Sequence, residues 1–265
     1  MPVRERSLRV EAVVLNHSDF GETDRLLVLF TRELGKVRAI AKGVRKPRSR
    51  KAGHLEPFTR SSLLLARGRN MYIVIQAETV QVYLQLDGDI DLQDYGNASY
   101  VVELLDRFTY EEGENRALYR LFINTLARLS AESDPNLPIR YYQIRLLDLL
   151  GFRPQLFNCA RCRKEIQPED QYFSAEEGGV LCPNCGRGTP GARPISMTAL
   201  KYLRHFQRSS YREAKQANIS PVIHRETEIL MQHYLTYLLE KNLNTPAFLR
   251  RVKRGEYINP RQADP

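Results

Sequence analysis

The stretch DRLLVLFTRELGKVRAIAKG, residues 24–43, contains two short runs with recurring apolar residues on either side of Leu34-Gly35. Apolar and polar residues alternate in the second run, which predicts a half-buried strand, and a glycine between two such runs is typical of a hairpin. Outward from this stretch, three further runs are SLRVEAVVLN (7–16), FTRSSLLLAR (58–67) and NMYIVIQAET (70–79). Five short strands in about 80 residues fit a small closed barrel such as the OB-fold. An open sandwich and an SH3-like barrel stay as alternatives, because strand count alone does not separate them.

After residue 90 the pattern becomes helical. Apolar residues recur at spacings of three and four, as on one face of a helix. Ser196 is a candidate N-cap, and Ser220 with Pro221 forms a second start signal. The runs are SYVVELLDRF (99–108), ALYRLFINTLARL (117–129), PIRYYQIRLLDLLG (138–151), MTALKYLRHF (197–206) and VIHRETEILMQHYLTYLLEKN (222–242).

The order of these patterns predicts an α+β multidomain chain. We expect an OB-fold nucleic-acid-binding domain at 1–82, followed by a mainly α-helical domain made of 83–156 and 190–265. A four-cysteine module at 157–189 is expected to be inserted into that helical domain. With 265 residues and 42% hydrophobic content, the chain has enough apolar material for packed cores.

Compartment is also predicted from the sequence. No run reaches eighteen consecutive apolar residues, and the first residues lack the apolar stretch of a signal peptide. We therefore expect a cytoplasmic protein whose four cysteines stay reduced rather than forming disulfides.

Charge is strongly polarised along the chain, although the formal net charge is only +9. Residues 1–80 carry 16 basic and 8 acidic side chains, whereas residues 87–134 carry 4 and 11. Residues 186–265 are again basic, with 14 and 6. Two basic ends that flank an acidic helical segment favour a polyanionic partner, which means nucleic acid or an anionic membrane surface.

The densest basic run extends from the third predicted strand into the loop after it. It has eight basic residues in sixteen and no acid. A phosphate backbone relieves the mutual repulsion of such cations, and counterion release drives binding. The alternative is a solvated loop without a partner. We predict DNA binding by Lys36, Arg38, Lys42, Arg45, Lys46, Arg48, Arg50 and Lys51. Phe58 and Tyr72 are candidates for base stacking or for barrel core.

Four cysteines form the clearest metal motif. Cys159-x2-Cys162 and Cys182-x2-Cys185 are separated by 19 residues, as in zinc ribbons. Four thiolates complete a tetrahedron and leave no open position, so we expect structural Zn²⁺ without catalysis. Unligated thiols and redox-active pairs are the alternatives. Glu22 and Asp24 could form a metal or catalytic pair, but we interpret them as part of a turn in which Asp24 bonds local backbone or pairs with Arg25 or a neighbouring arginine.

Several of these segments also carry a family resemblance. VVLNHSDFGETDRLLVLFTRELGKVRAIAKGVRKPRSR with LEPF, LLDLLGFRPQLFNCARC, GGVLCPNC and TYLLEKNLNTPAFL occur in this order over most of the chain. In these stretches the chain resembles the RecO family of bacterial recombination mediators. The resemblance implies an OB-fold, a helical domain and a zinc module.

The resemblance also implies a function in DNA repair and recombination. It implies binding to single- and double-stranded DNA, annealing of complementary strands, and action with RecR and single-stranded DNA-binding protein to help load RecA. It implies no catalytic residue, so we expect a protein that is not an enzyme. An RNA-binding OB and zinc-ribbon module, a metal-dependent nuclease and a protein scaffold are the other hypotheses.

Overall fold

The computed structural model describes residues 7–84, 91–111, 113–240 and 243–254. They form two compact units. Unit 1 contains the chain up to Glu132 together with the segment from Thr245 onward, and unit 2 is Ser133–Asn244. These units are defined by contacts between residues, whereas the predicted domains were defined by sequence pattern. The predicted domain boundaries therefore stay a prediction.

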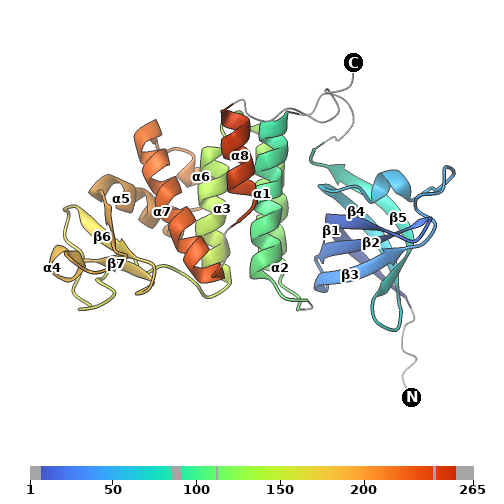
Figure 1. Ribbon diagram of the computed structural model, residues 1–265, viewed down its shortest axis with the longest axis horizontal. Coiled ribbons are helices and arrows are strands. Elements are labelled where there is room, and N and C mark those ends of the chain that lie inside the picture. Colours follow the sequence, from blue (N-terminus) through green and yellow to red (C-terminus); the bar gives the residue numbers. More distant parts are fainter. Residues whose placement is uncertain (1–6, 85–90, 112, 241–242, 255–265) are drawn as a thin grey trace. The chain divides into compact units, whose positions relative to one another are not determined.

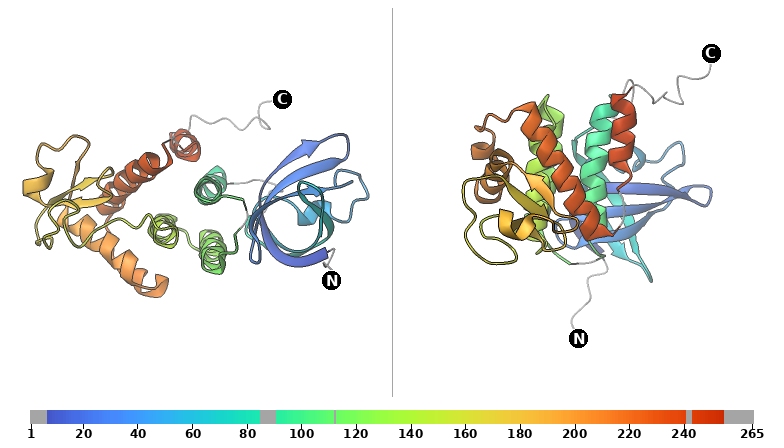
Figure 2. Two further views of the ribbon diagram at one scale, coloured as in Figure 1. Left: turned by 90° about the horizontal axis from the view of Figure 1, so that it is seen from below. Right: turned by 60° about the vertical axis from the view of Figure 1, so that its left-hand side comes forward.

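Unit 1 begins with a closed five-stranded barrel of strand order β1-β2-β3-β5-β4 (Figures 1 and 2). All pairs are antiparallel except β3 with β5, which pair in parallel only at Ala39 with Tyr72 and at Ile40 with Ile73. The barrel is OB-like, and the predicted fold of this region is confirmed. Its strands are β1 (Ser7–Phe20), β2 (Asp24–Thr31), β3 (Gly35–Ala41), β4 (Thr59–Arg67) and β5 (Tyr72–Val82).

Alternation along the strands builds the barrel core. In β3 the side chains of Val37, Ala39 and Ala41 point inward, while Lys36 and Arg38 lie on the outer face. A register shift between Val14 and Asn16 marks a bulge in β1. The remaining buried core residues are Val10, Ala12, Val14, Leu27, Leu29, Val44, Leu55, Leu63, Leu65 and Val74.

Three helices complete unit 1: α1 (Leu92–Phe108), α2 (Arg116–Ala131) and α8 (Thr245–Lys253). The barrel contacts α2 through aromatic rings, since Phe30 lies 6.0 Å from Tyr119 between ring centroids. Although α8 is remote in sequence, it lies beside α1 (Figure 1). Gly96 permits this approach, because a Cβ there would lie 2.4 Å from Leu249. The first helix begins at Leu92, seven residues before the predicted start, with Asp91 as its N-cap.

Unit 2 consists of helices and a small three-stranded sheet (Figure 1). Ser196 and Ser220 cap α5 and α7, as predicted. Lys241 and Asn242, which end the longest predicted helix, lie outside the described residues. The elements are α3 (Asn136–Leu149), β6 (Gln171–Ser174), β7 (Gly179–Leu181), α4 (Pro183–Gly186), β8 (Arg193–Ile195), α5 (Met197–Arg208), α6 (Tyr211–Ala214) and α7 (Pro221–Leu239).

Among all helices that the structure describes, none has the length and apolar character needed to cross a membrane.

Candidate nucleic-acid interface and metal centre

The basic loop, defined as residues 42–58, connects β3 to β4 and includes the 3-10 turn η1 (Ala52–His54). Both ends of the loop are anchored to the barrel. At the first end, Asp24 Oδ1 accepts a hydrogen bond of 2.7 Å from the Gly43 N–H. This N–H holds the pKa of Asp24 below its ordinary value. Asp24 therefore accepts from backbone, as one of the two interpretations predicted, but the donor lies 19 residues away rather than in the local turn.

The second end of the loop is anchored through Lys51 and His54. Lys51 Nζ donates to the Val74 carbonyl at 3.1 Å, and burial lowers the pKa of this amine. His54 Nδ1 lies 2.7 Å from Thr79 Oγ1. The ammonium group of Lys51 is therefore already hydrogen-bonded within the barrel, although the sequence analysis grouped this residue with the DNA-binding cations.

The same loop presents exposed cations. Arg45 contacts Asp19 at 3.2 Å and two carbonyl oxygens of the β1–β2 turn. Lys42, Lys46, Arg48 and Arg50 are exposed, and within the described part of the chain no ion pair or hydrogen bond is recorded for their charged groups. We refer to these four as the loop cations.

The other two predicted DNA-binding residues lie on β3 and have acidic partners. Lys36 Nζ is 3.0 Å from Asp106 Oδ1, and Arg38 forms an ion pair with Glu111. The structure therefore separates the eight predicted residues into free, loop-anchoring and ion-paired groups. Charge counting along the sequence did not detect these long-range pairs.

Two further cations were missed by sequence reasoning. Arg67 and Arg69 flank Gly68 at the β4–β5 connection and are exposed; in the described ranges they have no recorded ion pair. In OB-folds the connection between the fourth and fifth strands contributes to nucleic-acid binding. Once the strand order is known, the two arginines of Arg67-Gly68-Arg69 therefore become candidates for phosphate contact.

The candidate stacking residues differ in exposure. Phe58 is only 3% exposed and packs edge-on against Tyr95 of α1, with centroids 5.7 Å apart. Tyr72 is half-buried against the barrel core. Phe58 is therefore core, as its alternative interpretation predicted.

The four cysteines converge in unit 2. Their sulfur atoms all lie within 4.8 Å of one another. Cys162 Sγ and Cys182 Sγ are 3.8 Å apart, which matches the separation of about 3.8 Å expected in a zinc tetrahedron with bonds of about 2.3 Å. The donor set and the spacing both fit Zn²⁺.

Two local turns place these sulfurs. In the second turn, Pro183 begins α4, and the Cys185 and Gly186 N–H groups both donate to the Cys182 carbonyl. Gly186 also allows close packing, because a Cβ there would lie 2.4 Å from Tyr172 Cβ. The first turn closes through a hydrogen bond of 2.9 Å from the Arg163 N–H to the Cys159 carbonyl.

Backbone dipoles favour a thiolate at Cys159. Burial opposes ionisation, but N–H groups of Cys162, Cys182 and Arg161 outweigh it and lower the pKa of the thiol to about 6. By contrast, hydrogen bonding with Cys182 is the largest cause that raises the pKa of Cys185, to about 12. A cation with two positive charges would favour thiolates at all four positions.

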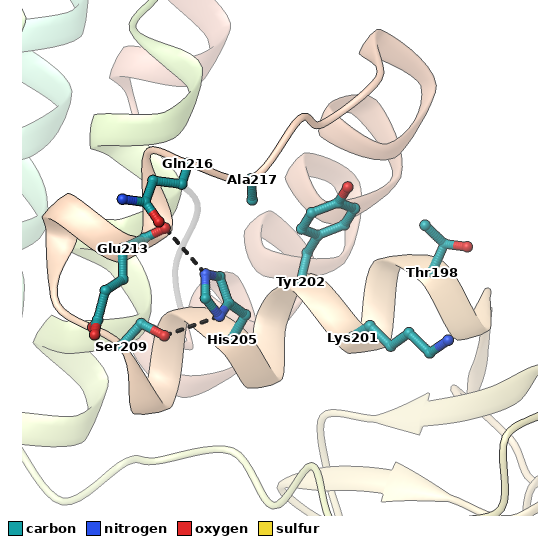
Figure 3. Close-up of a pocket in the computed structure, with 8 residues that line it drawn as sticks. All are labelled: Thr198, Lys201, Tyr202, His205, Ser209, Glu213, Gln216 and Ala217. Carbon is teal, nitrogen blue, oxygen red and sulfur yellow. Dashed lines mark hydrogen bonds between the residues drawn. The ribbon is translucent and has the colours of Figure 1, made fainter.

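A hollow of about 700 Å³ lies over α5 and α6 (Figure 3). His205 Nδ1 is 2.9 Å from Ser209 Oγ, and its Nε2 is 3.4 Å from the backbone carbonyl of Glu213. The Glu213 carboxylate instead accepts from Ser210 N–H at 2.7 Å and completes a capping box. A serine hydrolase requires the carboxylate to contact the imidazole, so these three residues do not form that triad.

Comparisons with known proteins agree with this architecture. The family models for Recombination protein O N terminal and Recombination protein O C terminal match residues 6–83 and 90–247. The DNA repair protein RecO of Roseiflexus sp. (strain RS-1) is 40% identical over 252 residues, covering 95% of this chain and 88% of that protein. The DNA repair protein RecO of Desulforudis audaxviator (strain MP104C) is 37% identical over 248 residues, covering 93% and 98%. The chain therefore belongs to the RecO family of DNA repair proteins.

Proposed function

We propose that this protein is a non-enzymatic recombination mediator that binds single- and double-stranded DNA and anneals complementary strands. The observation that carries the proposal is the set of four loop cations, Lys42, Lys46, Arg48 and Arg50, exposed without an internal ion pair in the described residues. Annealing requires no bond chemistry. A cationic surface that holds two strands lowers their repulsion and raises their effective concentration.

The interface is proposed to include all eight predicted residues, with unequal contributions. The loop cations contribute most, because none of the four is held by an ion pair or hydrogen bond within the described residues. Arg45 and Lys51 contribute less, since each already bonds to the barrel or the adjoining turn. Lys36 and Arg38 contribute only when their acidic partners are exchanged for phosphate.

Zinc has a structural role in this proposal. Cys159, Cys162, Cys182 and Cys185 would hold Zn²⁺ and fix the two turns of the cysteine module. A closed four-sulfur site has no open position for a metal-bound water, so it would not catalyse hydrolysis. The proposed DNA contacts lie on unit 1 rather than at the cysteines.

Membership of the RecO family supports the proposed protein partners. The proposed mediator acts with RecR and with single-stranded DNA-binding protein, and it helps RecA load onto coated DNA in the bacterial cytoplasm. No residue is assigned to these protein partners.

A strand-annealing assay tests the proposal. The loop variant K42Q/K46Q/R48Q/R50Q is compared with K164Q/R187Q/K201Q/R212Q, which removes the same charge from exposed positions of unit 2. We expect slow annealing by the loop variant and nearly wild-type annealing by the control. Equal rates for both variants would contradict the proposed interface, and tighter binding of a matched RNA than of DNA would favour an RNA-binding module.

A further inference from the structure

The two paired cations of β3 share one face of the barrel. Lys36 and Arg38 are two positions apart in a strand, so their side chains emerge on the same outer side. Lys36 Nζ contacts both the carboxylate of Asp106, at 3.0 Å, and its backbone carbonyl, at 2.7 Å. Arg38 Nε pairs with Glu111 Oε1. The acidic strap is defined here as residues 106–111, from the end of α1 to the bridge with β3.

Backbone contacts position the acidic strap beside the barrel. Glu111 forms a parallel β-bridge with Lys36, and the Gly113 N–H donates to the Leu34 carbonyl at 3.2 Å. Gly35 is required for this approach, because a Cβ there would lie 2.1 Å from the Gly113 carbonyl oxygen. Since β5 pairs only with the far end of β3, the strap occupies the edge that β5 leaves open.

The side chains of the strap are nevertheless exchangeable. The side chains of Asp106 and Glu111 are each 48% exposed and that of Arg38 is 67% exposed, whereas that of Lys36 is only 12% exposed. The Arg38–Glu111 pair is therefore the weaker and more accessible of the two. A guanidinium group donates paired hydrogen bonds to phosphate oxygens as it does to carboxylate oxygens.

Space for a ligand surrounds the Arg38–Glu111 pair. Two hollows of about 350 Å³ each are lined by Arg38, Met71 and Glu111. One of them also includes the exposed Arg67 and Arg69. The Arg38–Glu111 pair therefore lines both hollows, and one of them also holds two exposed arginines.

We propose that Asp106 and Glu111 act as an internal competitor for DNA phosphates. The two carboxylates neutralise Lys36 and Arg38, and they largely keep these cations from the phosphates of a strand that binds the loop cations. The inference rests on the proposed DNA binding and deepens it by naming what limits affinity on β3.

Neutralising the strap tests the inference. The variant D106N/E111Q is compared with D94N/E114Q, which removes two carboxylates from the same acidic region, where Glu114 pairs with Arg116 rather than with β3. Binding of a single-stranded oligonucleotide is measured against salt concentration. Two freed cations should steepen the slope of log K against log salt by up to about 1.4 and tighten binding up to about 25-fold at 0.1 M salt. The control should keep the wild-type slope.

A second comparison tests the coupling. K36Q/R38Q should barely alter the slope in the otherwise native protein but should abolish the gain in the D106N/E111Q background. An equal loss in both backgrounds, or a strap variant that behaves as its control does, would overturn the inference. If the double strap variant does not fold, E111Q alone should give about half the gain in slope, about 0.7. Failure of the wild type to bind DNA at low salt would instead refute the proposed function.

Discussion

Two groups of cations that are adjacent in the sequence have opposite environments in the barrel. Lys36 and Arg38 on β3 face carboxylates from the end of α1 and the segment that follows it. Lys46, Arg48 and Arg50 project from the following loop, where the described residues offer them no ion pair. The difference shows that counting charges along the sequence overestimates how many cations contribute to DNA binding. Only cations without an acidic partner gain the full free energy of counterion release.

The largest expected effect tests whether DNA contact is confined to unit 1. Removing zinc with a chelator, or replacing Cys159 and Cys162 by serine, should destabilise unit 2 strongly, because structural zinc supplies about 10 kcal/mol in small zinc domains. Circular dichroism and thermal melting should record the loss. The salt slope for single-stranded DNA should stay close to that of the zinc-loaded protein. A slope that collapses with the metal would place essential DNA contacts in unit 2.

A single loop cation should have the next largest effect. Arg48→Gln should lower the salt slope by about 0.7 and weaken binding about fivefold at 0.1 M salt, because one phosphate contact is lost. Fluorescence anisotropy with a labelled oligonucleotide measures both values. Arg212→Gln is the matched control, since it removes an exposed arginine of unit 2. Indistinguishable slopes for the two variants would remove Arg48 from the interface.

The loop anchor should have a smaller effect. Asp24→Ala removes the acceptor of the Gly43 N–H, so the loop must be ordered on binding and affinity should fall about twofold. The pKa of Asp24 is lowered in the folded protein chiefly by this N–H. Its stabilising contribution is therefore complete above the ordinary value of 3.8 and is lost as pH falls through the lower folded value.

Hydrogen exchange measures this anchor directly. Protection of the Gly43 amide, relative to its intrinsic exchange rate, should be constant from neutral pH down to the ordinary aspartate value and should fall below it. A decline that begins near neutral pH would assign the protection to another group.

The smallest expected effect is on β3. Arg38→Gln should change affinity for single-stranded DNA by less than about twofold in the native background, because its charge is already neutralised by Glu111. The same anisotropy titration compares it with Arg48→Gln. Equal losses for the two arginines would eliminate the distinction between paired and unpaired cations.

Local pattern predicted five short strands and the convergence of the four cysteines, although strand count alone left a sandwich and an SH3-like barrel open beside the OB-fold. Alternation in residues 35–41 placed Val37, Ala39 and Ala41 in the core, and spacing alone brought the four cysteines together. These features depend on periodicity and on short turns, which sequence encodes directly.

Long-range contacts could not be predicted in this way. The pairing of Lys36 with Asp106 joins residues 70 positions apart. The packing of α8 on α1 depends on Gly96, whose role is visible only when Leu249 lies against it. Both contacts depend on how the elements are arranged in space, so they required the structure.

The most direct test is the salt dependence of single-stranded DNA binding by the wild type and by K42Q/K46Q/R48Q/R50Q. If the four loop cations contact phosphates, the slope of log K against log salt should fall in magnitude by up to about 2.8, at about 0.7 for each neutralised phosphate. A variant that folds as the wild type does and retains the wild-type slope would contradict the basic loop as the DNA interface.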